Sequence, residues 1–270
     1  MNLNTVTEVK RPKSLDEIQG WRAGNAWLAG GTWLFSEPQI QTDTLIDLET
    51  LDWPSLGATG DGLEIAATCK IAELDAYQPP KSWRAAGLIH ECCRSFLSSF
   101  KIWNEATIGG NIVMSLPAGP MISLTVGLEA EYELWPREGT PRRMRAVDFV
   151  TGNHANELAP GELLRAIHVK SSVLKKRHAF RRASLTHLGR SSVLLIGTRY
   201  EESVLLTVTA ATIKPIQITF ERATSARDVR AAIDAAISPD MYLEDVHGSP
   251  AHRRHLTYHF AQEICEELFA

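Results

Sequence analysis

Two pairs of adjacent glycines, each set between apolar residues, constrain this chain more than any other feature of its sequence. The first pair lies in LAGGTWLF, residues 28–35, and the second lies in ATIGGNI, residues 106–112. Glycine has no Cβ, so it accepts a positive φ and allows another group to approach the backbone closely. Each pair therefore predicts either a tight turn or a loop that something contacts at its backbone.

Neither pair belongs to a G-x-G-x-x-G or a G-x-x-x-x-G-K-[ST] motif, so the sequence predicts neither a Rossmann site nor a P-loop. A glycine pair followed by Thr32 or Asn111 nevertheless offers consecutive backbone N–H groups with no side chain in the way. Such a row of donors suits a pyrophosphate. On the local sequence alone, a plain turn remains the commoner explanation of either pair.

The composition excludes several classes of function. The 270 residues carry 28 basic and 32 acidic side chains, a net charge of −4, so no overall positive field favours nucleic acid or an anionic membrane surface. The N-terminal residues lack the apolar core of a signal peptide, and no apolar run is long enough to span a membrane. We therefore expect a cytoplasmic protein with no nucleic-acid partner.

The cysteines and histidines form no clear metal or redox motif. The cysteines are Cys69, Cys92, Cys93 and Cys265. They make neither a C-x-x-C pair nor an iron–sulfur run, so reduced and mostly buried thiols are expected. His255 and His259 have the i, i+4 spacing of a zinc pair, but no glutamate lies between them as in H-E-x-x-H. We expect no metal site here, and a solvated or partner-facing helix surface around these histidines.

The apolar pattern predicts a mixed α and β chain in which strand-like segments predominate beyond residue 141. Residues 81–100 place apolar side chains at helical spacing, and residues 120–130 predict a further helix after the second glycine pair. Beyond residue 141, successive segments rich in Val, Ile, Leu and Thr predict an antiparallel sheet. Two helices should close the chain, the last beginning with Ser249 as N-cap and Pro250 as its first residue.

These segments, in this order, resemble the FAD-binding subunit of molybdenum hydroxylases, the family of xanthine dehydrogenase and aerobic carbon monoxide dehydrogenase. AGGTWL resembles the first flavin loop of that family, and TIGGN resembles the second. Further likeness lies in LIDLETL at 45–51, in VDFVTGNHANELAPGELLRAIHV at 147–169 and in YLEDVHGSPAHRRHL at 242–256. The resemblance covers nearly the whole chain, which makes it more specific than either glycine loop alone.

The resemblance implies an α+β fold with three parts. A two-subdomain FAD-binding region of the vanillyl-alcohol-oxidase/PCMH type would be followed by a C-terminal domain with a small antiparallel sheet and helices. We expect FAD-binding subdomain 1 over residues 1–55, FAD-binding subdomain 2 over residues 56–165 and the C-terminal domain over residues 166–270. FAD would lie between the two subdomains.

The resemblance also implies a set of cofactor-binding residues. Both glycine loops would hold the FAD pyrophosphate by main-chain N–H groups, so an alanine at any of the four glycines would meet phosphate or require a disfavoured φ. Leu164 matches a leucine that packs near the isoalloxazine ring, and Arg181 stands where the family often has a lysine near that ring. The expected set is Ala29, Gly30, Gly31, Thr32, Trp33, Leu34, Phe35, Thr107, Ile108, Gly109, Gly110, Asn111, Leu164 and Arg181.

Several positions depart from the family pattern. Leu116 and Pro120 occupy positions where the family usually has a serine and an aspartate that helps to hold FAD. Trp103 replaces a frequent arginine, and Leu185 stands where another arginine is expected. Two outcomes remain open: the lost polar contacts weaken FAD binding, or stacking by Trp33 and Trp103 replaces them.

The function implied by the resemblance is electron transfer within a multi-subunit molybdenum hydroxylase. A large subunit would carry the molybdopterin cofactor, and a small subunit would carry two [2Fe–2S] clusters that deliver electrons to the FAD of this chain and on to a final acceptor. We expect a heterotrimer or its dimer, with no catalytic side chain here. Two alternatives are a scaffold subunit of the same complex that has lost FAD binding, and a free-standing flavin oxidase.

Overall fold

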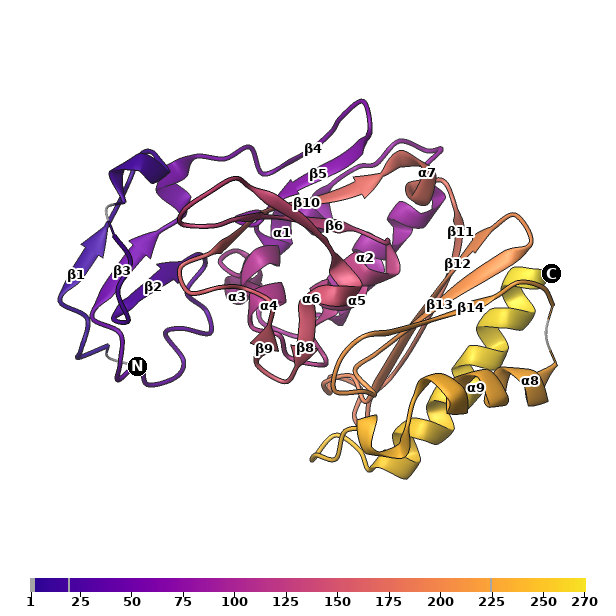
Figure 1. Cartoon of the computed structure of the whole chain (residues 1–270). Coiled ribbons are helices and arrows are strands. Elements are labelled where there is room, and N and C mark those ends of the chain that lie inside the picture. The colour runs from indigo at the N-terminus through magenta and orange to yellow at the C-terminus, as the bar shows by residue number, and fades with distance from the viewer. Residues whose placement is uncertain (1–2, 19, 224) are drawn as a thin grey trace.

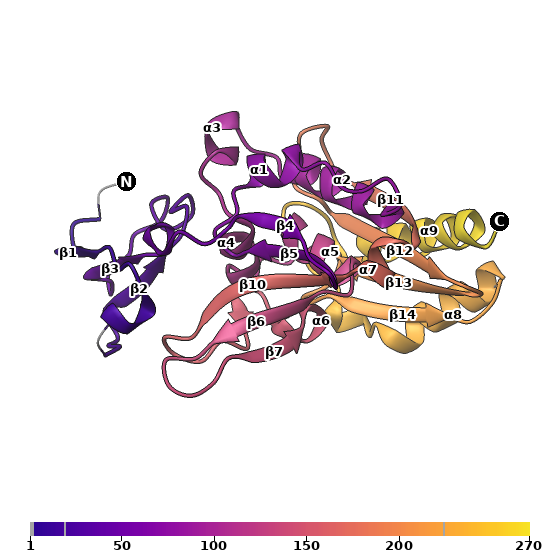
Figure 2. The same ribbon diagram turned by 90° about the horizontal axis from the view of Figure 1, so that it is seen from above.

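The computed structural model describes residues 3–18, 20–223 and 225–270, and arranges them around three principal sheets (Figure 1). These sheets follow one another along the molecule, with the N-terminal sheet at one end and the C-terminal helices at the other (Figure 2). The mixed α and β class expected from the sequence is confirmed.

The first sheet is parallel and has its strands in the order β1-β3-β2. Its elements are β1 (Glu8–Lys10), β2 (Asn25–Leu28) and β3 (Thr44–Asp47), with the 3₁₀ turns η1 (Leu15–Glu17) and η2 (Glu49–Leu51). Leu45 and Ile46 of β3 are buried and anchor this small sheet. Because β2 and β3 run in the same direction, the first glycine loop and η2 leave the sheet at the same edge.

The second sheet is antiparallel and has the order β4-β5-β10-β6-β7. Its strands are β4 (Leu56–Ala58), β5 (Gly62–Ala66), β6 (Glu131–Trp135), β7 (Arg142–Arg145) and β10 (Leu163–Lys170). Between β5 and β6 the chain forms α1 (Ile71–Ala76), η3 (Arg84–Ala86), α2 (Gly87–Ser95), α3 (Phe100–Trp103), α4 (Ile108–Val113) and α5 (Pro120–Gly127). Ile65, Tyr132 and Ile167 of the sheet share one buried cluster with Leu88 and Met121 of these helices. These helices therefore cover one face of the sheet.

The third sheet is an antiparallel meander in the order β11-β12-β13-β14, as expected from the Val-, Ile- and Leu-rich segments beyond residue 141, except that the first of these segments, at 162–170, joins the second sheet as β10. Its strands are β11 (Arg177–Ala183), β12 (Val193–Tyr200), β13 (Ser203–Thr209) and β14 (Ile216–Phe220), followed by α8 (Ala226–Ala236), η4 (Pro239–Met241) and α9 (Pro250–Phe269). Short elements before this sheet are α6 (Ala146–Phe149), β8 (Val150–Gly152), β9 (Ala155–Asn156) and α7 (Ser171–Leu174). The start of α9 is confirmed, because Ser249 Oγ accepts a hydrogen bond from His252 N–H at 3.3 Å.

Strand β12 belongs to both hydrophobic cores. Leu194 and Ile196 pack into the cluster formed by the second sheet and its helices. Val193 and Leu195 point to the opposite face and pack into the cluster formed with α8 and α9. Since side chains alternate across a strand, one short segment joins the two cores.

Arg253 on α9 is a buried polar centre of the C-terminal part. Its side chain is 1% exposed, and its guanidinium pairs with the carboxylate of Asp245. Nη1 donates to Ser192 O at 2.5 Å and to Ala210 O at 2.8 Å, while Nε donates to Gly248 O at 3.2 Å. One arginine thus ties the start of α9 to the chain beside β12 and β13.

The thiols are buried, as expected from the cysteine pattern. All the cysteines are free and buried. Burial raises the pKa of Cys69 and that of Cys93 to about 12 each, so both thiols stay protonated near neutral pH. Protonated buried thiols are poor nucleophiles and poor metal ligands.

Candidate functional site

A cavity of about 470 Å³ lies among the two glycine loops, the segment after α2, the turn from α4 to α5 and the loop between β11 and β12. Of the residues expected to bind the cofactor, those that line it are Ala29, Gly30, Gly31, Thr32, Trp33, Leu34, Thr107, Gly110 and Asn111. Those that do not line it are Phe35, Ile108, Gly109, Leu164 and Arg181. The structure therefore brings the two loops together at one cavity.

The first glycine loop presents a row of backbone donors to this cavity. The N–H groups of residues 29–34 have no hydrogen-bond acceptor within the described part of the chain. Gly31 has a φ of +68°, which side chains disfavour, and a Cβ there would lie 2.5 Å from Cε2 of Phe35. The disfavoured φ expected in the loop is thus found at Gly31, and the row of donors is suited to an anion.

Gly30 makes a different contact from the one expected. A Cβ built on Gly30 would overlap the carbonyl oxygen of Glu105 and would lie 2.6 Å from its carbonyl carbon. Glu105 immediately precedes the segment of the second glycine pair. The group that approaches Gly30 is therefore the backbone leading into the other loop, and a side chain at Gly30 would separate the two loops.

The second glycine loop forms the first turn of α4, and its backbone N–H groups donate hydrogen bonds to acceptors within the protein. Gly109 N–H donates to Ala67 O at 2.9 Å, and Gly110 N–H donates to Thr107 Oγ1 at 3.0 Å. Asn111 N–H donates to Thr107 O at 3.1 Å. The expectation that both loops offer free N–H groups is therefore wrong for the second loop, because Thr107 caps a helix there. A Cβ on Gly109 would meet the Cβ of Ala67 at 2.5 Å, so this glycine is required for packing on the chain after β5.

The turn from α4 to α5 carries two of the positions that depart from the family pattern. Leu116 and Pro120 both line the cavity, so apolar surface replaces the polar side chains of the family there. Asn111 Oδ1 accepts a hydrogen bond from Met121 N–H at 3.1 Å and thereby fixes the start of α5. Pro120 is the first residue of α5, where the missing N–H has no intrahelical partner to lose.

The two tryptophans considered as stacking substitutes have different positions. Trp33 lines the cavity, and its ring centroid is 5.7 Å from that of His154. Trp103 does not line the cavity, and its Nε1 donates to Phe96 O at 2.9 Å. Only Trp33 is therefore placed to contact a ligand, whereas Trp103 supports the lining segment at Phe96.

Leu164 and Arg181, which the resemblance places near the isoalloxazine ring, do not line this cavity. Leu164 of β10 is 3% exposed and belongs to the core beneath the second sheet. Arg181 of β11 pairs with α9 through Glu263 and Glu267, with N–O distances of 2.7 Å each. The hydrogen bond to Glu263, with that to Glu267, raises the pKa of Arg181. Because side chains alternate between the two faces of a strand, the position of Arg181 in β11 directs its side chain toward α9.

The loop between β11 and β12 contributes cavity residues that the sequence analysis missed. Arg190 is the only charged side chain on the lining, and it forms no ion pair or hydrogen bond within the described residues. Arg182 anchors this loop, since its Nε donates to Ser191 Oγ at 2.7 Å and its Nη2 to Gly189 O at 2.5 Å. Arg190 lies five residues after Leu185, the position where the family has an arginine, so the sequence already offered an arginine in this region. Its place at the cavity depends on the conformation of the loop.

Other candidate sites find no support in the described ranges. No group of three His, Cys, Asp or Glu side chains there is placed to hold a metal ion, and His259 lies 3.3 Å from Glu263 on its own helix. Across the same ranges, no helix has the length and apolarity needed to cross a bilayer. The basic run from Lys175 to Arg182 is largely paired, for example through Lys176 and Glu129 at 2.5 Å.

Comparison with known proteins establishes the family. The family described as the FAD binding domain in molybdopterin dehydrogenase matches residues 5–170. The chain belongs to this family. The resemblance stated from the sequence is thus confirmed, and the chain contains the FAD-binding domain of an oxidoreductase. No curated protein sequence matches the chain.

Solved structures share the fold of this FAD-binding chain over almost its whole length. Carbon monoxide dehydrogenase from Hydrogenophaga pseudoflava, lacking the Mo-pyranopterin moiety of its molybdenum cofactor, matches with a TM-score of 0.83 at 18% identity, covering 98% of this chain and 97% of that chain. Reconstituted CO dehydrogenase from Oligotropha carboxidovorans gives 0.78 at 20% identity, with coverages of 97% and 96%. Quinoline 2-oxidoreductase from Pseudomonas putida 86 gives 0.77 at 15% identity, with coverages of 100% and 98%.

The cavity of the FAD-binding domain fits the diphosphate of a flavin nucleotide. The unpaired N–H groups of residues 29–34 and the guanidinium of Arg190 supply donors and positive charge. The buried Nε1 of Trp27, another lining residue, has no hydrogen-bond partner, which is uncommon for a buried donor. An apolar wall with a few unpaired polar groups is the usual chemistry of a cofactor site.

Proposed function

We propose that this chain is the FAD-binding electron-transfer subunit of a multi-subunit molybdenum hydroxylase, with the FAD diphosphate held in the cavity between the two glycine loops. The row of unpaired N–H groups at residues 29–34 carries this proposal. An anion is the ligand that such a row binds, and the family to which the chain belongs binds an anionic dinucleotide.

The residues of the site have separate roles in this proposal. The first glycine loop donates its N–H groups to the diphosphate, and Arg190 adds positive charge. Thr107 Oγ1 and Asn111 Oδ1 accept hydrogen bonds that hold α4 and the start of α5 in place, while the Thr107 hydroxyl hydrogen and the Asn111 Nδ2 group have no acceptor among the described residues and remain donors at the cavity. The flavin, when bound, supplies the redox chemistry, because it takes up electrons singly and releases them in pairs.

Electrons would reach this chain from a partner. We infer a small subunit with [2Fe–2S] clusters and a large subunit with the molybdopterin cofactor, assembled as a heterotrimer or its dimer. The family description and the CO dehydrogenase relatives support this inference. The chain supplies no recognisable cluster ligands, because its cysteines are buried and their spacing is not that of an iron–sulfur run.

The domain organisation also remains our proposal. We place FAD-binding subdomain 1 at residues 1–55, FAD-binding subdomain 2 from residue 56, and the C-terminal domain after it, in a fold of the vanillyl-alcohol-oxidase/PCMH type. β10 runs without interruption through residue 165 to Lys170, so we move the last boundary from 165 to 170. The family match ends at the same residue.

The flavin content of the purified complex tests the function directly. Denaturation should release about one FAD per chain, since the flavin carries the redox chemistry of the proposed subunit. A scaffold subunit is the second candidate, because Leu116 and Pro120 present apolar surface where the family has polar groups. A well-folded complex that contains no flavin and takes none up would establish the scaffold role. Rapid reduction of the flavin by a small organic substrate, without any partner, would instead indicate the free-standing oxidase.

Arg190 provides a second test of where the diphosphate lies. Changing Arg190→Gln should weaken FAD binding about tenfold or more, because a charge-assisted contact to phosphate is lost. Riboflavin, which has no phosphate, should bind the variant and the parent protein equally. Fluorescence titrations with both ligands would measure the two dissociation constants.

A matched control for this test is Arg227→Gln on α8, which removes an exposed arginine that does not line the cavity. It should leave both affinities unchanged. An equal loss of riboflavin affinity in the Arg190 variant would show that this arginine faces the flavin ring instead.

A further inference from the structure

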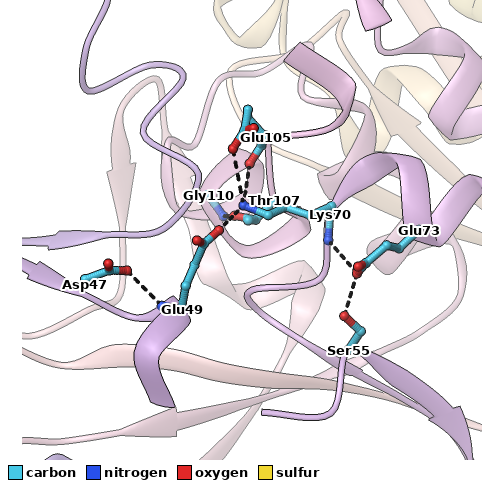
Figure 3. A network of polar contacts seen from close by, with 8 residues as sticks. All are labelled: Asp47, Glu49, Ser55, Lys70, Glu73, Glu105, Thr107 and Gly110. Carbon is cyan, nitrogen blue, oxygen red and sulfur yellow. Dashed lines mark hydrogen bonds and ion pairs between the residues drawn. The ribbon is translucent and has the colours of Figure 1, made fainter. Parts of the chain in front are cut away.

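Lys70 connects the first sheet with the entrance to the second glycine loop (Figure 3). Its Nζ pairs with the carboxylate of Glu49 in η2, donates to the backbone oxygen of Glu105 at 3.2 Å and lies 3.8 Å from Glu105 Oε2. The Lys70 side chain is 18% exposed, whereas the side chains of Glu49 and Glu105 are 47% and 64% exposed, so the lysine is mostly covered and its carboxylate partners face water. One ammonium group therefore bridges segments that are far apart in the sequence.

The backbone of Lys70 is itself fixed. It is the residue before α1, and its N–H donates to Glu73 Oε2 at 3.4 Å. The same oxygen accepts a hydrogen bond from Ser55 Oγ at 2.5 Å (Figure 3). Lys70 also forms an isolated β-bridge with Thr107, the cap of α4. The ammonium group thus extends from a rigid anchor beside the second glycine loop.

The oxygen that Lys70 holds is the oxygen against which the first glycine loop packs. A Cβ on Gly30 would overlap the Glu105 carbonyl, so Gly30 and the Lys70 ammonium converge on one atom. Glu49 follows β3 at the same sheet edge from which the first loop leaves β2. Lys70 therefore contacts both sides of the junction between the two loops, Glu49 on the side of the first loop and Glu105 on the side of the second.

We propose that Lys70 is a positioning residue for FAD, which holds the first glycine loop against the second so that the N–H groups of residues 29–34 converge on the diphosphate. This inference rests on the proposed function. Lys70 does not line the cavity and so acts through the loops. Its single positive charge also offsets one of the two negative charges of Glu49 and Glu105, whose carboxylates would otherwise repel each other across the contact and disfavour a nearby anion.

The decisive experiment compares Lys70→Met, Lys70→Arg and the control Lys81→Met in the full chain or its complex. Lys70→Met keeps much of the aliphatic stem and removes the charge, so FAD should bind about tenfold more weakly or worse. Lys70→Arg should recover most of the affinity, because a guanidinium can reach the same oxygens. Lys81 is exposed and its removal should change nothing.

A second readout does not depend on the flavin. In the flavin-free protein, chymotrypsin should cleave after Trp33, Leu34 or Phe35 faster in Lys70→Met than in Lys70→Arg or the control, because the first loop is no longer held. Unchanged cleavage and unchanged FAD affinity would overturn the positioning role. Faster cleavage in a protein that binds no FAD even when unmutated would refute the proposed function, and with it the role toward FAD, while showing that Lys70 still holds the first loop against the second.

Equal loss of thermal stability in Lys70→Met and Lys70→Arg, with no difference in FAD affinity between them, would also overturn the proposal. In that case Lys70 would serve only to stabilise the fold. The double variant Lys70→Met/Glu49→Gln separates the two cases further. If the pair acts together, its effect on FAD affinity should be smaller than the sum of the single effects.

Discussion

Gly30→Ala is expected to abolish FAD retention and to lower the free energy of unfolding by about 3 kcal/mol, at the upper end of overpacking costs. The added methyl would overlap the Glu105 carbonyl oxygen, so the two glycine loops must move apart. Neither side can yield easily, because the overlapping group is backbone that Lys70 also holds. The FAD content after gel filtration and urea denaturation would measure the two effects.

Gly57→Ala is the matched control for this substitution. Gly57 lies in β4, and a Cβ built there has no neighbour within 4 Å. The control should keep its FAD and change the unfolding free energy by less than about 1 kcal/mol, as surface substitutions usually do. If Gly30→Ala retained a full complement of flavin, the contact between the loops would not be required for the site.

Arg253→Met should cause the largest loss of stability, about 3–5 kcal/mol, because three buried carbonyl oxygens lose their donor at roughly 1–3 kcal/mol each. The substitution leaves the carbonyl oxygens of Ser192, Ala210 and Gly248 without their donor and Asp245 without its cation. Buried acceptors without donors are costly because water cannot replace the lost bonds. Chemical denaturation of the purified protein would measure the change.

The neighbouring residue provides the control. Arg254 is 42% exposed and pairs with the exposed carboxylate of Asp234. Arg254→Met should therefore change stability by no more than about 1 kcal/mol, as expected for a surface ion pair. Similar losses for the two arginines would contradict the central role assigned to Arg253.

The family and the importance of the first glycine loop could be predicted from the sequence. Family membership follows from several motifs in a fixed order, and the positive φ at Gly31 follows from glycine chemistry. The partner of Gly30 could not be predicted, since Glu105 is distant in the sequence and no local pattern links the two. Such long-range contacts depend on how the sheets pack.

The bonded N–H groups of the second loop and the position of Arg181 have separate physical causes. In the second loop, Thr107 caps a helical turn, so the N–H groups that looked free in the sequence are bonded within the protein. At Arg181, the strand register decides which face a side chain occupies, and that face meets the carboxylates of α9. The nearby loop instead brings Arg190 to the cavity, and loop conformation is poorly specified by local sequence.

The position of β12 between two cores has a consequence for how this molecule loses its structure. Leu194 and Ile196 serve one core while Val193 and Leu195 serve the other, so neither core can open without exposing apolar surface of the other. The strand is joined by the β11–β12 loop to the cavity lining at Arg190 and Ser191. Bound cofactor should therefore raise the unfolding temperature of the C-terminal helices as well as that of its own pocket. The whole chain would then unfold as one cooperative unit.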